Sequence, residues 1–190
     1  MFLSDVDIKK AVEAKEVVIS DFDEIRLQPA SYDILLGNKF IVTDPHTTSF
    51  IDPVNKIFPV SREIDVPQSG MFILHPGVSI LGYSKEYFGS EKYLIEVNGK
   101  SSLARIGLLV HNSASLINPG HFLNVALELC NLNNVPIILR PGMPIAQLTF
   151  STLSTSPKAD YKKIGRYSKN NIKGYIPARQ STTLSKKRSR

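Results

Sequence analysis

The sequence predicts a mainly β protein, a distorted β-barrel or jelly-roll-like body preceded by a short N-terminal helix. From Ile34 onward, brief apolar runs alternate with Gly, Pro and Asn at the spacing of strands and turns. The chain does not alternate such runs with long helical patterns, as a parallel α/β sheet would require. Its 190 residues suit one hydrophobic core with a flexible end.

Residues 4 to 16 predict the helix, because Ser4 can cap its first turn and Ile8, Ala11 and Val12 share one face. Seven apolar runs then predict strands: ILLGNKFIV, MFILHPGVSIL, YLIEV, IGLLV, VALELC, VPIILR and IAQLTF. After these runs the composition changes to Ser, Thr, Lys and Asn. We therefore predict a β domain over residues 1–157 and a basic C-terminal lid over 158–190, with a mobile tail at 181–190.

The net charge of +6 is unevenly distributed. Residues 158–190 contain eleven Lys or Arg against one acid, so a basic end follows a mildly acidic body. Such an end fits a clamp for a small anion at least as well as a nucleic-acid contact. No apolar run approaches a membrane span, the N-terminus lacks secretory character, and Cys130 has no second cysteine to pair with. We therefore expect a soluble, cytoplasmic protein without a membrane partner.

Glu128 is the first candidate for chemistry. In the run VALELC it shares a strand face with Ala126 and Cys130, while Leu127 and Leu129 point the other way. A carboxylate between small side chains suits general acid–base catalysis. The alternative is that this face is simply the solvent side of an antiparallel sheet.

The run GKSSLAR is the second candidate. A helical turn that begins at the serines would offer free N–H groups and hydroxyls to phosphate oxygens. Ser101 and Arg105 would then share one face, because they are four residues apart. The alternative is an ordinary turn with a capping serine and an exposed arginine.

Six longer motifs resemble one known family. The runs LQPASYDILLG, FILHPGVSILGYSKEYF, VNGKSSLARIGLLVH, INPG, ALEL and RPGMPIAQLTF follow the order and spacing of the dCTP deaminases, the deaminating branch of the dUTPase-like trimers. The resemblance runs from about Met1 to Ile176. It implies a β-clip, dUTPase-like fold, a homotrimer with active sites at subunit interfaces, and zinc-independent deamination of dCTP.

By position in these motifs, Glu128 would be the proton shuttle, and Ser101 would hold the attacking water with the carbonyl of Ala114. Arg105 would stabilise charge beside Glu128. Magnesium would enter with the nucleotide triphosphate and not through protein ligands. The substrate-binding residues that the resemblance implies are Lys100, Ser101, Ser102, Leu103, Ala104, Arg105, Asn118, Ala126, Leu127, Glu128, Gln147, Tyr161 and Lys169.

The sequence departs from the family pattern at INPGHFLN. Asn118 replaces an aspartate that meets the deoxyribose 3′-hydroxyl and that activates water in dUTPases. An amide can bond a hydroxyl but cannot accept a proton at neutral pH. Ser115 and Leu116 match neither the dUMP-forming nor the purely deaminating pattern. We therefore predict release of dUTP, with a dUMP-forming bifunctional enzyme or a dUTPase as the alternative.

The basic end also departs from the family pattern, since GRYSKNNIKGY aligns only with a gap. Lys169 is the predicted lid contact, and a solvated basic extension is the alternative. A nucleotide-binding protein without catalysis also stays open, although the combination of Ser101, Arg105 and Glu128 favours an enzyme. Nucleic-acid binding through KKRSR is disfavoured, because no base-reading motif accompanies it. Zinc is not expected, and we expect a structural role for the histidines His46, His75, His111 and His121, which lack metal-ligand spacing.

Overall fold

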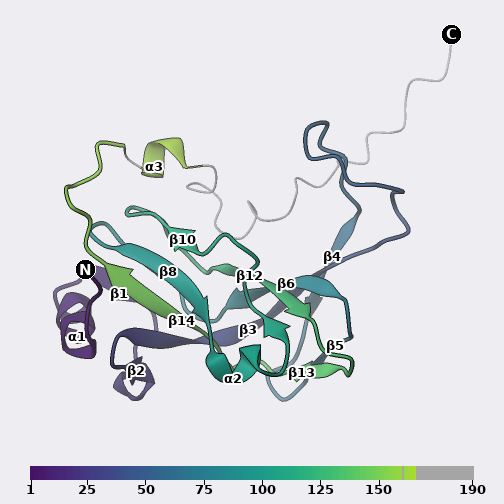
Figure 1. Ribbon diagram of the computed structural model, residues 1–190, viewed down its shortest axis with the longest axis horizontal. Helices are drawn as coiled ribbons and strands as arrows, with labels where there is room; N and C mark the ends of the chain where they lie inside the picture. The colour runs from purple at the N-terminus through teal and green to yellow at the C-terminus, as the bar shows by residue number, and fades with distance from the viewer. Residues whose placement is uncertain (160, 166–190) are drawn as a thin grey trace, which may run out of the picture.

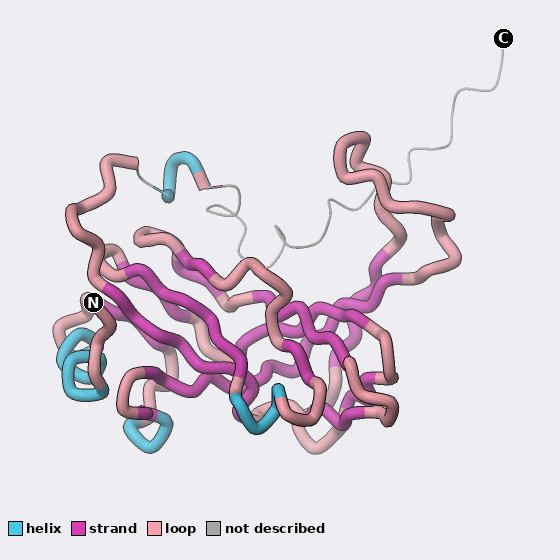
Figure 2. Tube along the Cα trace, in the orientation of Figure 1, coloured by secondary structure: helices cyan, strands magenta, loops and turns pink. Residues whose placement is uncertain are grey.

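The computed structural model describes residues 1–159 and 161–165, and this part of the chain is mainly β, as predicted (Figure 1). Figure 2 shows strands through the centre of the molecule and helices at its periphery. The strands are β1 Val17–Ile19, β2 Leu27–Gln28, β3 Ser31–Thr43, β4 Ser61–Asp65, β5 Phe72–Leu74, β6 Ser79–Ser84, β7 Phe88–Ser90, β8 Leu94–Gly99, β9 Leu108–Leu109, β10 Leu116–Ile117, β11 Phe122–Leu123, β12 Ala126–Asn131, β13 Ile137–Leu139 and β14 Pro144–Ser151. The helical segments are α1 Asp5–Glu13, the 3-10 turn Glu24–Arg26, α2 Ser101–Ala104 and α3 Tyr161–Ile164.

A curled antiparallel sheet forms the body. Its strands follow the order β10-β8-β14-β3-β6-β12-β9, and β2 and β4 also pair with β3. The first half of β3 pairs with β14, with Asp33 opposite Gln147, and the second half pairs with β6, with Phe40 opposite Gly82. The β3–β6 register shifts between Leu36 and Phe40, and such an irregularity bends a strand and increases its twist. This bend lets one long strand serve both halves of the sheet.

Two smaller sheets, β1-β7-β11 and β13-β5, complete the β structure. The core is one large cluster to which all of the longer strands contribute. Its largest fully buried side chains include Tyr32, Phe40, Phe88 and Phe150. The apolar runs predicted as strands therefore supply most of the core, because their alternation places every second residue inside.

The predicted N-terminal helix is confirmed, with an earlier end than expected. The Ser4 hydroxyl accepts a hydrogen bond from the Asp7 N–H at 3.4 Å, as its capping role requires. The helix ends at Glu13 because Lys15 adopts a left-handed φ of 58°, and the N–H of Glu16 then bonds the Ala11 carbonyl at 2.9 Å. No helix in the described residues is long and apolar enough to cross a membrane.

Candidate active site

The polar cluster that follows β8 forms a single helical turn, α2. Lys100 is its N-cap, and its carbonyl accepts hydrogen bonds from the N–H groups of Leu103 and Ala104 at 3.0 and 2.9 Å. The Arg105 N–H donates to the Ser101 carbonyl at 3.1 Å, which places these two side chains on one face. Leu103 packs against the core and anchors the turn. The predicted turn beginning at the serines is therefore confirmed.

A surface cavity of about 390 Å³ opens beside α2. Strand register explains why distant segments meet there, because Gln147 of β14 pairs with Asn98 of β8 on one side and with Asp33 of β3 on the other. The residues that line the cavity are Gln28, Pro29, Ala30, Ser31, Lys100, Ser101, Ser102 and Gln147. Residues 100 to 102 and Gln147, all predicted to bind substrate, therefore share one cavity.

Gln147 connects the walls of this cavity. Its Nε2 donates a hydrogen bond to the Gly99 carbonyl at 3.3 Å, at the end of β8. Its Oε1 accepts a hydrogen bond from the Ser31 hydroxyl at 3.2 Å, at the start of β3. Both ends of the amide are thus used, and the side chain is held in one orientation.

Asp33 is a residue of the site that the sequence analysis missed. The Lys100 ammonium forms an ion pair with its Oδ2, and its Oδ1 is buried without a hydrogen-bond partner among the described residues. The Lys100 and Asp33 side chains are only 22% and 12% exposed, so solvent screens the pair weakly. The available signal was an acid between Tyr32 and Ile34 in an apolar strand, a position that acids rarely occupy without a partner.

Glu128 lies on β12 with a half-buried side chain. Its Oε2 accepts a hydrogen bond from the Asn112 N–H at 3.3 Å. On the same strand face, Ala126 is buried in a small second apolar cluster with Ile41 and Tyr83. This face is therefore partly covered, and the carboxylate has a backbone donor that orients it.

The other predicted residues near Glu128 are placed as follows. The side chains of Ala126 and Leu127 are buried, so only their backbone can meet a ligand. Ala114 is exposed, two residues beyond Asn112 in the same loop. In the part of the chain that the structure describes, no hydrogen bond or ion pair joins Glu128 to α2 or Arg105. Within these residues, Glu128 and the residues of α2 are therefore not joined into one hydrogen-bonded network.

Asn118 begins a tight turn that ends at His121. Pro119 occupies the second position, and Gly120 occupies the third with a φ of 85°, as a type II turn requires. The His121 N–H donates to the Asn118 carbonyl at 3.0 Å. The Asn118 side chain is exposed, and the His121 ring stacks on Tyr161 of α3 with 4.4 Å between centroids. The turn thus brings the predicted sugar contact close to the start of the predicted lid.

The structure describes only the first residues of the predicted lid, 158–159 and 161–165. Lys162 of α3 forms an ion pair with Glu91, which follows β7, and this pair attaches α3 to the body. Lys169 and the predicted mobile tail at 181–190 lie outside the described residues.

Acidic and histidine side chains are scattered over the described residues. No three His, Cys, Asp or Glu side chains gather there into a group that could hold a metal ion. His46 and His75 are exposed, whereas His121 is buried. At the cavity beside α2 the nearby carboxylate is that of Asp33, which is already paired with Lys100. A cation there would need most of its ligands from a bound substrate.

Comparisons with known proteins identify the family. A family model described as dCTP deaminase-like matches residues 2–153. A Tropheryma whipplei (strain Twist) protein named "dCTP deaminase, dUMP-forming" is 44% identical over 162 residues, which cover 85% of this chain and 83% of that one. A protein of the same name from Coprothermobacter proteolyticus is 37% identical over 168 residues, which cover 88% and 90% of the two chains.

A solved structure shares the fold. The crystal structure of 2′-deoxycytidine 5′-triphosphate deaminase from Agrobacterium tumefaciens matches with a TM-score of 0.61 at 23% identity, over 80% of this chain and 48% of that one. The predicted fold class is therefore confirmed. Because the family model spans most of the chain and both relatives exceed 30% identity over most of its length, the chain belongs to the dCTP deaminase-like family.

Proposed function

We propose that this protein deaminates dCTP by hydrolysis, with Glu128 as the proton shuttle. The observation that carries the proposal is the cavity beside α2, where Lys100, two serines and Gln147 meet. An ammonium group and hydroxyl donors suit the oxygens of a phosphate chain. Membership of the family and the names of the relatives support dCTP as the substrate.

In the proposed reaction, Glu128 takes a proton from water while the water oxygen bonds to C4 of cytosine. The acid then protonates N3, and a further proton transfer lets the C4–N bond break and ammonia leave. The Ser101 hydroxyl and the Ala114 carbonyl hold the water, and Arg105 stabilises the developing negative charge. All proton transfers use protein groups, without zinc. The Asn112 N–H supports this role because it orients the Glu128 carboxylate.

Magnesium would accompany the triphosphate in this proposal. No carboxylate is among the described residues that line the α2 cavity, so the phosphate oxygens of the substrate would be the main ligands of this cation. Lys100 and residues 101–102 would orient the phosphate chain. The cation would supply neutralisation of the phosphate charge.

We further propose that a second copy of the chain completes the site within a homotrimer. Glu128 is not among the residues that line the α2 cavity within one chain, and this supports the arrangement. Two inactive variants test it, because Ser101→Ala disables one group and Glu128→Gln disables the other. Coexpression with two affinity tags would isolate mixed oligomers. Recovered ammonia release in these oligomers supports shared sites, whereas isolated mixed oligomers without activity would contradict them.

We propose dUTP as the product, because the Asn118 amide cannot act as a base for attack on phosphate. Formation of dUMP is the second candidate, favoured by the names of the relatives. The test is incubation with dCTP and Mg²⁺, ion-exchange separation of nucleotides, and assays for ammonia and pyrophosphate. Ammonia with dUTP supports the first candidate, and ammonia with equal pyrophosphate and dUMP supports the second. Unchanged dCTP would contradict both and favour a nucleotide-binding protein without catalysis.

A further inference from the structure

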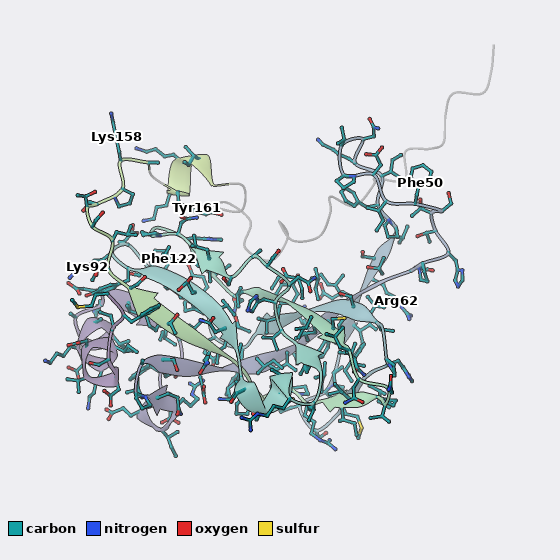
Figure 3. All side chains as sticks on the ribbon, in the orientation of Figure 1. Phe50, Arg62, Lys92, Phe122, Lys158 and Tyr161 are labelled. Carbon is teal, nitrogen blue, oxygen red and sulfur yellow. The ribbon has the colours of Figure 1, made fainter. Side chains whose placement is uncertain are left out.

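A buried histidine lies where α3 meets the body. The His121 imidazole is 6% exposed and stacks on the Tyr161 ring, with 4.4 Å between centroids and 25° between planes. Lys162, the next residue of α3, pairs with Glu91 and lies 5.7 Å from the ring centroid of Phe122. Tyr161 and Phe122 lie on the same side of the molecule (Figure 3). His121, Phe122 and Glu91 together form what we term the α3 seat.

Backbone geometry fixes the orientation of this seat. β11 pairs with β7, with Phe122 opposite Gly89. A Cβ atom at Gly89 would lie 2.5 Å from Phe122 Cδ1 and 2.6 Å from the His121 carbonyl oxygen, so a glycine is needed for this close approach. The turn before β11 is equally constrained, because Gly120 has a left-handed φ of 85°. Both rings are therefore presented to α3 in a fixed direction.

The His121 side chain acts here as an aromatic ring with one unused polar atom. Burial lowers the pKa of His121, so the ring is neutral at pH 7. Its Nε2 is buried without a hydrogen-bond partner among the described residues. The titratable and charged groups at the seat are Tyr161, stacked on the ring, and the Glu91–Lys162 ion pair. A neutral, buried ring of this kind suits stacking more than proton transfer.

We propose that His121 is a positioning residue that couples the turn carrying Asn118 to the lid carrying Tyr161. The inference rests on the proposed function and on the expectation, from the family resemblance, that both of these residues contact the nucleotide. His121 ends the turn that Asn118 begins, and its ring stacks on Tyr161, so it holds the two contacts at a fixed separation. Loss of the stack would release one of these contacts. Glu128 and Ser101 would stay in place, so the KM for dCTP should rise more than kcat falls.

The stack itself can be tested without any enzymatic activity. The chain contains no tryptophan, so Tyr161→Trp places a single fluorescent reporter on the His121 ring. We expect its indole ring to be shielded from acrylamide in the full-length protein. His121→Ala in this background should increase acrylamide access, and His121→Phe should keep the shielding. Equal acrylamide access with His and with Ala at position 121 would overturn the stack.

The kinetic test uses the otherwise native protein. An aromatic pair of this kind predicts that His121→Ala raises the KM for dCTP about 2- to 10-fold, with kcat nearly unchanged. His121→Phe should restore KM, and His75→Ala, which removes an exposed histidine, is the matched control and should leave both constants unchanged. A stack that forms while KM stays unchanged would refute the positioning role. If dCTP is not turned over at all, the proposed function fails. The Kd for dCTP is then measured instead of KM, and we expect the same increase of about 2- to 10-fold in His121→Ala over the native protein.

Discussion

Glu128→Gln tests the chemistry that we assign to β12. The substitution keeps the size of a half-buried side chain, and its amide oxygen can still accept the hydrogen bond that the Asn112 N–H donates at 3.3 Å. No other side chain of the described residues depends on this carboxylate for a hydrogen bond. We therefore expect the free energy of unfolding to change by about 0.5 kcal/mol or less.

The catalytic effect should be much larger, because an amide cannot carry a proton from water to the base. General acid–base catalysis contributes about 10²- to 10⁴-fold, so kcat should fall by that factor. This corresponds to about 3–5 kcal/mol in the activation barrier, at 1.36 kcal/mol for each factor of ten. The KM for dCTP should change little, because Lys100 and the serines of α2 are untouched.

The assay is ammonia release at saturating dCTP and Mg²⁺, with urea unfolding measured on the same samples. Glu96→Gln is the matched control, since Glu96 is a half-buried acid on β8, opposite Leu116 and Thr149, and has no part in the proposed reaction. The control should retain its turnover. Undiminished turnover in Glu128→Gln would refute the proton-shuttle role.

Three further changes have expected outcomes. Glu86→Gln leaves Arg26 without its fully buried carboxylate partner, so the free energy of unfolding in urea should fall by about 3 kcal/mol. The control is Glu24→Gln, which neutralises an exposed acid, and an equal loss of unfolding free energy in the two variants would contradict the argument. Asn118→Asp restores a group that can accept a proton, so the ratio of pyrophosphate to ammonia should rise, and an unchanged ratio would count against our interpretation of this position. Burial lowers the pKa of His121 below its ordinary 6.5, which means that the undocked ring binds protons more readily than the seated one. Docking of α3 should therefore weaken as pH falls below about 6.5 and stay constant above it. Acrylamide access to Tyr161→Trp between about pH 5 and 8 checks this, and a midpoint above 6.5 would contradict it.

Local patterns were sufficient to predict most of the elements. The runs ILLGNKFIV and VALELC fall within or across β3 and β12, because alternation of apolar residues is a property of neighbouring positions. The start of α1 was also predictable, because an N-cap serine such as Ser4 is a local signal. Its end was not, because Lys15 takes the left-handed position that glycine usually occupies, and no local preference indicates this.

The candidate site likewise has features that the sequence could predict and features that it could not. The turn at Ser101 and the half-buried position of Glu128 could be inferred from nearby residues. The ion pair between Lys100 and Asp33 could not, because it depends on how β8, β14 and β3 align. The stack of His121 on Tyr161 likewise joins residues that lie far apart in the chain.

By itself, the sequence determined the chemical groups of this protein, the mainly β fold and the family to which it belongs. These follow from composition, alternation and motif order, all of which can be read along the chain. Only the tertiary structure decided that Gln147 meets α2 at one cavity, that Asp33 pairs with Lys100, and that Glu128 does not line that cavity. The physical reason is that strand register and a bend in β3 set these contacts, and both result from the packing of the whole sheet.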